Sequence, residues 1–149
     1  MREKELKVLI FKLNGEYYAT DIMEVERILG YEQPTKIPDS PAYFEGVINY
    51  QGTILPVLNL AKKFNLDYKG VCDETKIIVA KQDETRIGVI VDVVSEVRDV
   101  NEESMEEPTD VVFGISKRYM KGLIKLNEKI IMFLNLSRVL SEDEKNLII

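Results

Sequence analysis

The stretch FEGVINYQGTILPVLNLAKKF, Phe44–Phe64, contains two apolar runs followed by the beginning of a helix. Glu45–Tyr50 and Thr53–Leu58 are rich in β-branched and aromatic residues, and the Gln-Gly pair between them is suited to a tight turn. Asn59 is placed to accept hydrogen bonds from the first turn of a short helix that continues to the end of the stretch. The stretch therefore predicts a two-stranded hairpin followed by a capped helix.

The same pattern returns 76 residues further along the chain. Glu45–Phe64 aligns without a gap on Lys121–Leu140, and a match of this kind indicates an internal repeat. The aligned pairs include Gly46 with Gly122, Ile48 with Ile124 and Ile54 with Ile130. The second copy predicts strands at Tyr119–Leu126 and Lys129–Leu134, and Asn135 is expected to cap a helix that runs towards Leu140.

Two further hairpins are predicted, one before each copy of the repeat. Leu6–Leu13 and Glu16–Thr20 flank an Asn-Gly pair, which is the strongest short hairpin signal. Thr75–Lys81 and Arg86–Val91 flank a polar turn. These two hairpins resemble each other only loosely, and chance remains an alternative explanation for their similarity.

The segments between the hairpins carry helix and loop signals. Asp21 followed by Glu24 resembles a capping box, so Ile22–Arg27 is expected to form about two helical turns before the chain becomes extended again. Three prolines keep Pro34–Pro41 out of helix. Asn101–Lys117 is polar and acidic, and we expect a long exposed loop there.

The composition favours a mainly β fold. Val and Ile together number 31 and Ala only 4, and β-branched side chains pack well on pleated sheets. With 149 residues, the chain is long enough for one compact body or two small lobes that share a core. We expect two similar small barrels, approximately residues 1–68 and 69–149 in chain order, packed together, and strands could be exchanged between them.

The composition also excludes several functions. The chain has no histidine and a single cysteine, Cys72, so neither the commonest general base nor an internal disulfide is available. No phosphate-binding glycine loop and no EF-hand order of acidic residues occurs, and we expect no catalytic residue, no metal and no cofactor. A net charge of −6 disfavours nucleic acid, and neither a membrane-spanning run nor a signal peptide is visible. A cytoplasmic protein is expected.

Several blocks of the sequence resemble the CheW-like domain family, which includes the chemotaxis coupling protein and the regulatory domain of the kinase CheA. The blocks are Tyr18–Tyr31 (YATDIMEVERILGY), Pro34–Pro41, Phe44–Phe64, Arg86–Val97 (RIGVIVDVVSEV) and Tyr119–Leu123 (YMKGL), in the family's order. Because the chain has no room for a kinase or receiver module, it is more similar to the free-standing coupling protein than to a fragment of CheA. The resemblance covers nearly the whole chain and implies a single CheW-like domain over residues 1–149.

The resemblance implies two five-stranded SH3-like barrels and a few short helices. It also implies a non-catalytic adaptor that joins methyl-accepting chemoreceptor tips to the CheA regulatory domain. Such an adaptor is cytoplasmic and is associated with membrane receptor arrays through these partners. In the family the receptor tip, a helical hairpin, lies in an apolar groove between the lobes. The matching residues here are Val25, Ile28, Val94 and Val97. A groove of branched side chains suits an apolar helix stripe, although the alternative is that the four residues are ordinary core.

The kinase contact is implied to use pseudo-equivalent barrel surfaces. The expected residues are Gly52, Thr53 and Ile54 on one hairpin, with the loop from Glu106 to Val111 as a second contact that closes rings with further copies. A hairpin also needs Gly52 simply to turn, and acidic loops are most often just solvated.

The sequence departs from the family pattern at one pair of positions. Many members carry a Glu and an Arg there, a charge pair thought to matter for signalling, and this chain has Arg27 and Gln51. The Arg27 guanidinium could still donate a hydrogen bond to the Gln51 carbonyl.

A small barrel that binds oligonucleotides or sugars is the rival class. Tyr17, Tyr18, Tyr43 and Tyr50 could stack on bases, but no basic residues are interleaved with them, and binding to single strands in a gel-shift assay would favour this rival.

Overall fold

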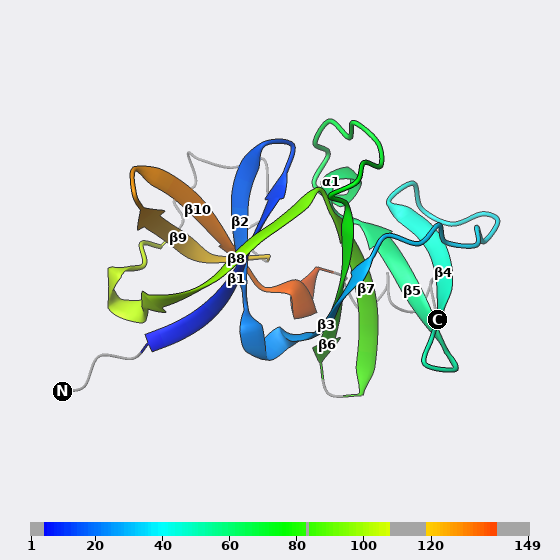
Figure 1. Ribbon diagram of the computed structural model, residues 1–149, viewed down its shortest axis with the longest axis horizontal. Helices are drawn as coiled ribbons and strands as arrows, with labels where there is room; N and C mark the ends of the chain where they lie inside the picture. Colours follow the sequence, from blue (N-terminus) through cyan, green and yellow to red (C-terminus); the bar gives the residue numbers. More distant parts are fainter. Residues whose placement is uncertain (1–4, 83, 108–118, 140–149) are drawn as a thin grey trace.

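The computed structural model describes residues 5–82, 84–107 and 119–139 and shows ten strands with four very short helical segments (Figure 1). The strands are β1 (Glu5–Leu13), β2 (Glu16–Asp21), β3 (Val25–Gly30), β4 (Phe44–Tyr50), β5 (Thr53–Asn59), β6 (Lys76–Gln82), β7 (Thr85–Val91), β8 (Val93–Asn101), β9 (Met120–Leu126) and β10 (Lys129–Leu134). The helical segments are η1 (Ile22–Glu24), α1 (Leu60–Lys63), η2 (Glu102–Ser104) and η3 (Leu136–Arg138). All four predicted hairpins are therefore confirmed.

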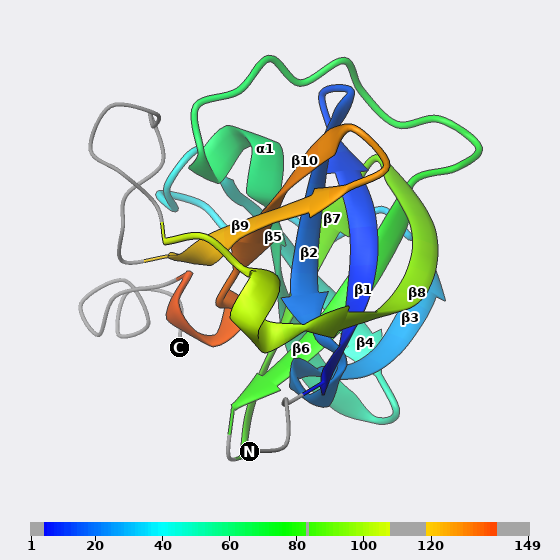
Figure 2. The same ribbon diagram turned by 90° about the vertical axis from the view of Figure 1, so that its left-hand side faces the viewer.

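The strands form two five-stranded sheets, which lie side by side as two lobes (Figure 1). Figure 2 views the molecule from the end that carries β9 and β10, so that one lobe stands in front of the other. Lobe 1 has the strand order β8-β1-β2-β10-β9, and lobe 2 has the order β3-β6-β7-β5-β4. Within each lobe one pair is parallel, β10 with β2 and β5 with β7, and the other pairs are antiparallel. The predicted mainly β fold of two five-stranded lobes is confirmed.

Each lobe draws its strands from both halves of the chain. Lobe 1 combines the first hairpin with the last one, and lobe 2 combines the two middle hairpins. The remaining strand of each lobe is exchanged, because β3 joins β6 in lobe 2 and β8 joins β1 in lobe 1. The lobes in space therefore differ from the chain-order division into residues 1–68 and 69–149.

The internal repeat appears as equal backbone geometry in the two lobes. Tyr43 O accepts a hydrogen bond from Asn59 N at 2.7 Å, and the equivalent Tyr119 O and Asn135 N also lie at 2.7 Å. In each lobe a residue before the repeat hairpin forms an isolated β-bridge with the first strand of that hairpin. Thr35 pairs with Val47 of β4, and Glu106 pairs with Leu123 of β9. The gapless repeat in the sequence thus corresponds to a repeat in structure.

Gly46 is required by this bridge. Its φ of +133° is unfavourable for other residues, and a Cβ atom there would meet the carbonyl group of Thr35, whose carbon would be only 2.6 Å away. The repeat partner Gly122 is similarly crowded, because its Cβ would lie 2.7 Å from the side chain of Met105. Glycine therefore lets the bridging segment approach the hairpin in both lobes.

The core has three parts. One cluster lies inside lobe 1 around Val8, Ile10 and Phe133, and another lies inside lobe 2 around Ile48, Val57 and Ile90. The largest cluster, which we call the seam, joins the two lobes and contains residues from both. Its buried members are Leu9, Phe11, Leu13, Tyr18, Phe44, Leu58, Leu60, Phe64, Ile78, Ala80, Ile87, Val89, Val91, Met120, Leu134, Leu136 and Val139.

The predicted helix at Ile22–Arg27 is too long. Only Ile22–Glu24 is helical, as a 3-10 turn with Asp21 as its N-cap, and β3 begins at the next residue. Glu24 does not complete a capping box, because its carboxylate accepts hydrogen bonds from Thr20 Oγ1 at 2.9 Å and from Leu136 N at 3.1 Å. The helix ends at Glu24 because β3 pairs with β6 from Val25 onward, and the Glu24 carboxylate instead links this turn to η3.

Two other local predictions are only partly right. Asn59 caps α1 by accepting from Lys62 N at 3.0 Å, as expected. Asn135 makes no such cap, because its Oδ1 accepts from Ser137 Oγ at 2.6 Å, and only a 3-10 turn follows among the described residues. The predicted loop from residue 101 begins with the 3-10 turn η2, and its part from residue 108 to 117 lies outside the described residues.

Candidate partner-binding surfaces

The receptor-groove candidates on β3 are Val25 and Ile28, and both face the seam. Val25 lies opposite Ala80 and Ile28 lies opposite Ile78, and both of these partners are buried members of the seam. Residues directly opposite each other on paired strands share one face of the sheet. Val25 and Ile28 are three residues apart, and a bulge at Glu26 lets both lie on this same face.

The candidates on β8, Val94 and Val97, have the same arrangement in lobe 1. Val94 lies opposite Phe11 and Val97 lies opposite Leu9, which are again buried seam residues. A register shift between Ile10 and Phe11 provides the bulge that this spacing requires. Both exchanged strands therefore direct the predicted residues to the face that the two lobes share.

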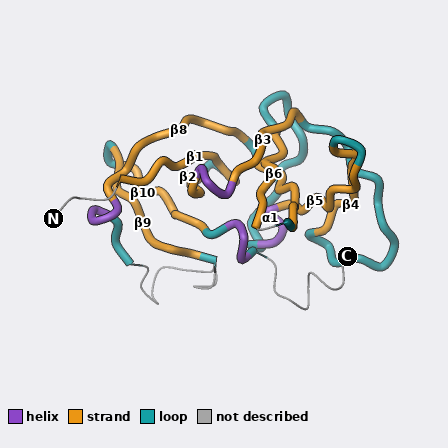
Figure 3. The backbone as a smooth tube through the Cα atoms, turned by 90° about the horizontal axis from the view of Figure 1, so that it is seen from below, coloured by secondary structure: helices purple, strands orange, loops and turns teal. Residues whose placement is uncertain are grey.

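Together the four residues form what we call the seam strip. β3 and β8 are each the edge strand of their lobe, and they lie along the same side of the molecule (Figure 3). Val25 and Val94 are partly buried against the seam, whereas Ile28 and Val97 remain 40% and 49% exposed. Val25 and Val94 therefore fit in part the alternative that these residues belong to the core, whereas Ile28 and Val97 leave apolar surface exposed for a partner.

The kinase-face candidates form the tip of the β4–β5 hairpin. Gln51 and Gly52 have φ values of 51° and 81°, and the Gly52 amide donates to Asn49 Oδ1 at 3.1 Å. Turn geometry therefore accounts for Gly52. Ile54, one residue beyond Thr53, is 76% exposed, and no requirement of the fold explains an isoleucine there.

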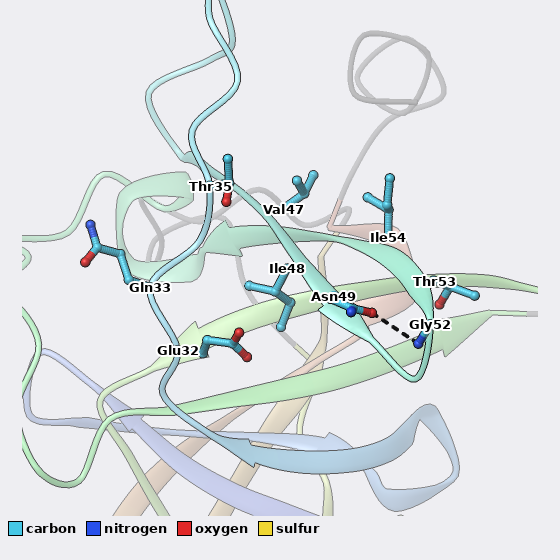
Figure 4. A pocket seen from close by; sticks show the side chains of 9 residues that line it. All are labelled: Glu32, Gln33, Thr35, Val47, Ile48, Asn49, Gly52, Thr53 and Ile54. Atoms are coloured by element: carbon cyan, nitrogen blue, oxygen red, sulfur yellow. Dashed lines mark hydrogen bonds between the residues drawn. The ribbon is translucent and has the colours of Figure 1, made fainter.

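Hollows lie on both sides of Ile54. The first has a volume of about 530 Å³ between β4 and the segment before it (Figure 4). It is lined by Glu32, Gln33, Thr35, Val47, Ile48, Asn49, Gly52, Thr53 and Ile54. The second, of about 490 Å³, lies between the β4–β5 and β6–β7 hairpins and is lined by Val47, Thr53, Ile54, Leu55, Pro56, Glu84, Thr85 and Arg86. We call Ile54 with these hollows the hairpin face.

The other predicted contact lies in lobe 1. Glu106 follows η2, pairs with Leu123 of β9, and forms an ion pair with Lys125 at 3.3 Å. The η2 and β9 segments lie at the opposite end of the molecule from the β4–β5 hairpin (Figure 1). Val111 lies outside the described residues. The structure therefore separates Glu106 from the Ile54 group.

Arg27 and Gln51 are not joined by a hydrogen bond within the described part of the chain. The neighbouring residue Glu26 instead accepts from Arg86 Nε and from the hydroxyl of Tyr50, each at 2.8 Å. The hydrogen bond from Tyr50, followed by that from Arg86, lowers the pKa of Glu26. Burial and the contact with Glu26 raise the pKa of Tyr50.

Ile130 is among the exposed apolar residues that the sequence did not single out. Ile130 is the repeat equivalent of Ile54, at the start of β10, and its side chain is 57% exposed. The gapless alignment already paired these two residues, so the repeat itself carried the signal. Each lobe therefore presents an isoleucine at the same place on its repeat hairpin.

The described residues contain no group of three His, Cys, Asp or Glu side chains arranged to hold a metal ion. Cys72 is exposed with a free thiol. No helix in the part of the chain that the structure describes is long and apolar enough to cross a membrane. What the geometry does offer is a pair of separate apolar surfaces, which defines a two-lobed β protein of the binding-module class.

The comparisons with known proteins agree with this class. Residues 7–144 match the family model of the CheW-like domain, and the chain therefore belongs to the CheW-like domain family. It is 33% identical to the chemotaxis protein CheW of Thermotoga maritima over 93% of this chain and 90% of the relative. It is 31% identical to CheW of Klebsiella aerogenes, over 94% and 84%.

A solved structure is also similar over nearly the whole fold. The crystal structure of the scaffolding protein TtCheW from Thermoanaerobacter tengcongensis superimposes with a TM-score of 0.87 at 31% identity. The match covers 96% of this chain and 92% of that one. The arrangement of both lobes is thus shared with that scaffolding protein.

Proposed function

We propose that this chain is a non-catalytic adaptor that couples chemoreceptor tips to the histidine kinase CheA in bacterial chemotaxis. The observation that carries the proposal is the presence of two sets of exposed apolar residues, one in the seam strip and one on the hairpin face. Relatives over nearly the full chain are chemotaxis proteins, and the similar crystal structure is of a scaffolding protein. An adaptor needs two such surfaces because it must hold two partners at once.

The seam strip is proposed to bind the receptor tip. A helical hairpin carries an apolar stripe, and Val25, Ile28, Val94 and Val97 provide branched side chains on the seam-facing side of the two edge strands β3 and β8. A helix that covers the strip would remove the exposed parts of Ile28 and Val97 from water. This burial is the proposed source of the affinity for the receptor.

The hairpin face is proposed to bind the regulatory domain of CheA, through Gly52, Thr53 and above all Ile54. Exposed large apolar residues beside hollows are typical anchors of protein interfaces. Glu106, at the other end of the molecule, and Val111, which lies outside the described residues, are proposed for a second contact that joins further copies or kinase domains into rings. Arg27 and Gln51 remain the positions at which this chain departs from the family's signalling pair.

The proposed adaptor acts in the cytoplasm as one domain spanning residues 1–149, and reaches the membrane only through its receptors. It uses no cofactor, metal or nucleic acid. The receptor conformation would alter kinase activity through different contacts at the two surfaces, without any bond being made or broken in the adaptor.

Calorimetry of the full chain with each purified partner tests the proposal. The expected result is separate binding of a receptor signalling fragment and of the CheA regulatory domain, with neither blocking the other. Absence of binding to both partners, or competition between them for one surface, would refute it.

A further inference from the structure

Arg86 is held in one orientation by a network across three strands. Its Nε lies 2.8 Å from both carboxylate oxygens of Glu26 on β3, and that carboxylate also accepts from the hydroxyl of Tyr50 on β4 at 2.8 Å. Tyr50 is buried, with a relative exposure of 6%, so its hydroxyl is a fixed reference point. The network therefore restricts the Arg86 side chain before any partner arrives.

The Glu26 contact uses only the Nε of Arg86. Among the described residues, its two terminal nitrogens have no hydrogen-bond partner, and the side chain is 43% exposed. Arg86 also lines the second hollow of the hairpin face together with Ile54 and Pro56. Positioned N–H donors thus lie at the wall of a hollow that has an exposed isoleucine on another side.

The surroundings of Arg86 are locally basic although the whole chain is acidic. Lys81 lies directly opposite Arg86 on the neighbouring strand, and Arg27 lies close enough to affect the pKa of Tyr50. Glu26 is already paired, and Glu84 is the carboxylate that lines the same hollow. Arg86 and these two cations outnumber the two acids. The local charge therefore favours binding of an anionic group, although the net charge of the chain is −6.

We propose that Arg86 is a pre-positioned anchor for a carboxylate of the kinase partner, beside an apolar side chain that packs on Ile54. The terminal nitrogens of a guanidinium match the two oxygens of a carboxylate, and Arg is a frequent hot-spot residue when an apolar contact excludes water around it. This inference rests on the proposed function and adds the chemistry that the docking segment of CheA must present. Glu26 and Tyr50 are the positioning residues.

The test is calorimetric titration of the CheA regulatory domain into the full chain and its variants at low and high salt. Arg86→Gln is expected to weaken binding about tenfold or more, which is the effect of losing one charge-assisted pair. Lys81→Gln removes a positive charge on the neighbouring strand, directly opposite Arg86, that the network does not orient, and it is the matched control. Tyr50→Phe leaves Arg86 charged but removes one hydrogen bond that holds Glu26. Its loss of affinity for the CheA regulatory domain is expected to be smaller than that of Arg86→Gln.

The results separate this inference from the proposed function. If the wild-type chain binds and Ile54→Asp abolishes binding while Arg86→Gln binds as well as wild type, the carboxylate anchor is refuted and the adaptor function stands. Equal losses for Arg86→Gln and Lys81→Gln would also refute it, because they would indicate a general charge effect. Restored binding between Arg86→Glu and a partner variant with one carboxylate changed to Lys would confirm the pairing. A dependence of self-association or of receptor binding on Arg86, with kinase binding unchanged, would assign the site to another occupant.

Discussion

Val97→Glu is the most informative substitution in the seam strip. In the free protein the side chain is 49% exposed, so the carboxylate can extend into water and the fold should lose little. In the receptor complex the same position would be covered. Binding then loses the burial of about half a valine side chain, about 1 kcal/mol, and must bury a carboxylate without a partner, which costs about 2 kcal/mol or more.

The expected total is therefore about 3 kcal/mol, which is roughly a hundredfold loss of affinity for a receptor signalling fragment. Calorimetry with the purified fragment measures the loss directly, and the same preparation should bind the CheA regulatory domain with unchanged affinity. Val71→Glu is the matched control, because Val71 has the same side chain and is 50% exposed in the segment between α1 and β6. The control should bind both partners normally.

Thermal unfolding distinguishes a lost surface from a damaged fold. A change below about 1 kcal/mol in unfolding free energy would move the melting temperature of a chain of this length by no more than about 4 °C. If Val97→Glu lowers the melting temperature much further, or weakens the binding of both partners equally, Val97 is a core residue and the assignment of the seam strip is wrong.

Three further substitutions test the other parts of the account. Ile54→Asp should weaken binding of the CheA regulatory domain at least tenfold in calorimetry and leave receptor binding intact, while Ile37→Asp, at another exposed isoleucine of lobe 2, should leave the binding of both partners intact. Gly46→Ala should lower the unfolding free energy in denaturant titration by about 3 kcal/mol, since strain and a backbone clash add, whereas Gly30→Ala, which has open space, should be nearly neutral. Glu24→Gln should cost about 1 kcal/mol in the same titration because it replaces a charged hydrogen-bond acceptor; an unchanged midpoint would show that the contact with η3 is unimportant.

The hairpins could be predicted from the sequence because their signals are local. Asn14 and Gly15 have φ values of 50° and 81°, and Asn127 and Glu128 have values of 50° and 66°, as two-residue hairpin turns require. The repeat also predicted that two lobes would share one design. Apolar runs and turn residues decide such features within about twenty residues of chain.

An exchange of strands between the lobes was among the expectations from the sequence, but local signals could not identify β3 and β8 as the strands that are exchanged. Both strands have ordinary apolar patterns, and their partners are chosen by the seam, where Ile28 meets Ile78 and Val97 meets Leu9. The predicted length of the helix after Asp21 was wrong because it, too, depends on contacts between distant parts of the chain. Glu24 has a capping pattern, but a backbone amide of η3, 112 positions away, takes its carboxylate.

The candidate site was predictable only as far as the family resemblance extended. The four seam-strip residues do share a face, but the ion pair between Glu26 and Arg86 links positions 60 apart, and neither residue is conspicuous in the sequence. Electrostatic partners across three strands depend on register and on the bulge in β3. Such contacts need the three-dimensional structure.

Co-sedimentation tests the central claim most directly, because it requires both surfaces in one molecule. Receptor signalling fragments clustered on vesicles are mixed with CheA, and the CheA in the pellet is measured with and without this chain. The account predicts that the chain increases the CheA in the pellet and that Val97→Glu and Ile54→Asp each abolish the increase, even when the two variants are mixed. An undiminished increase with a chain that carries both substitutions would contradict it.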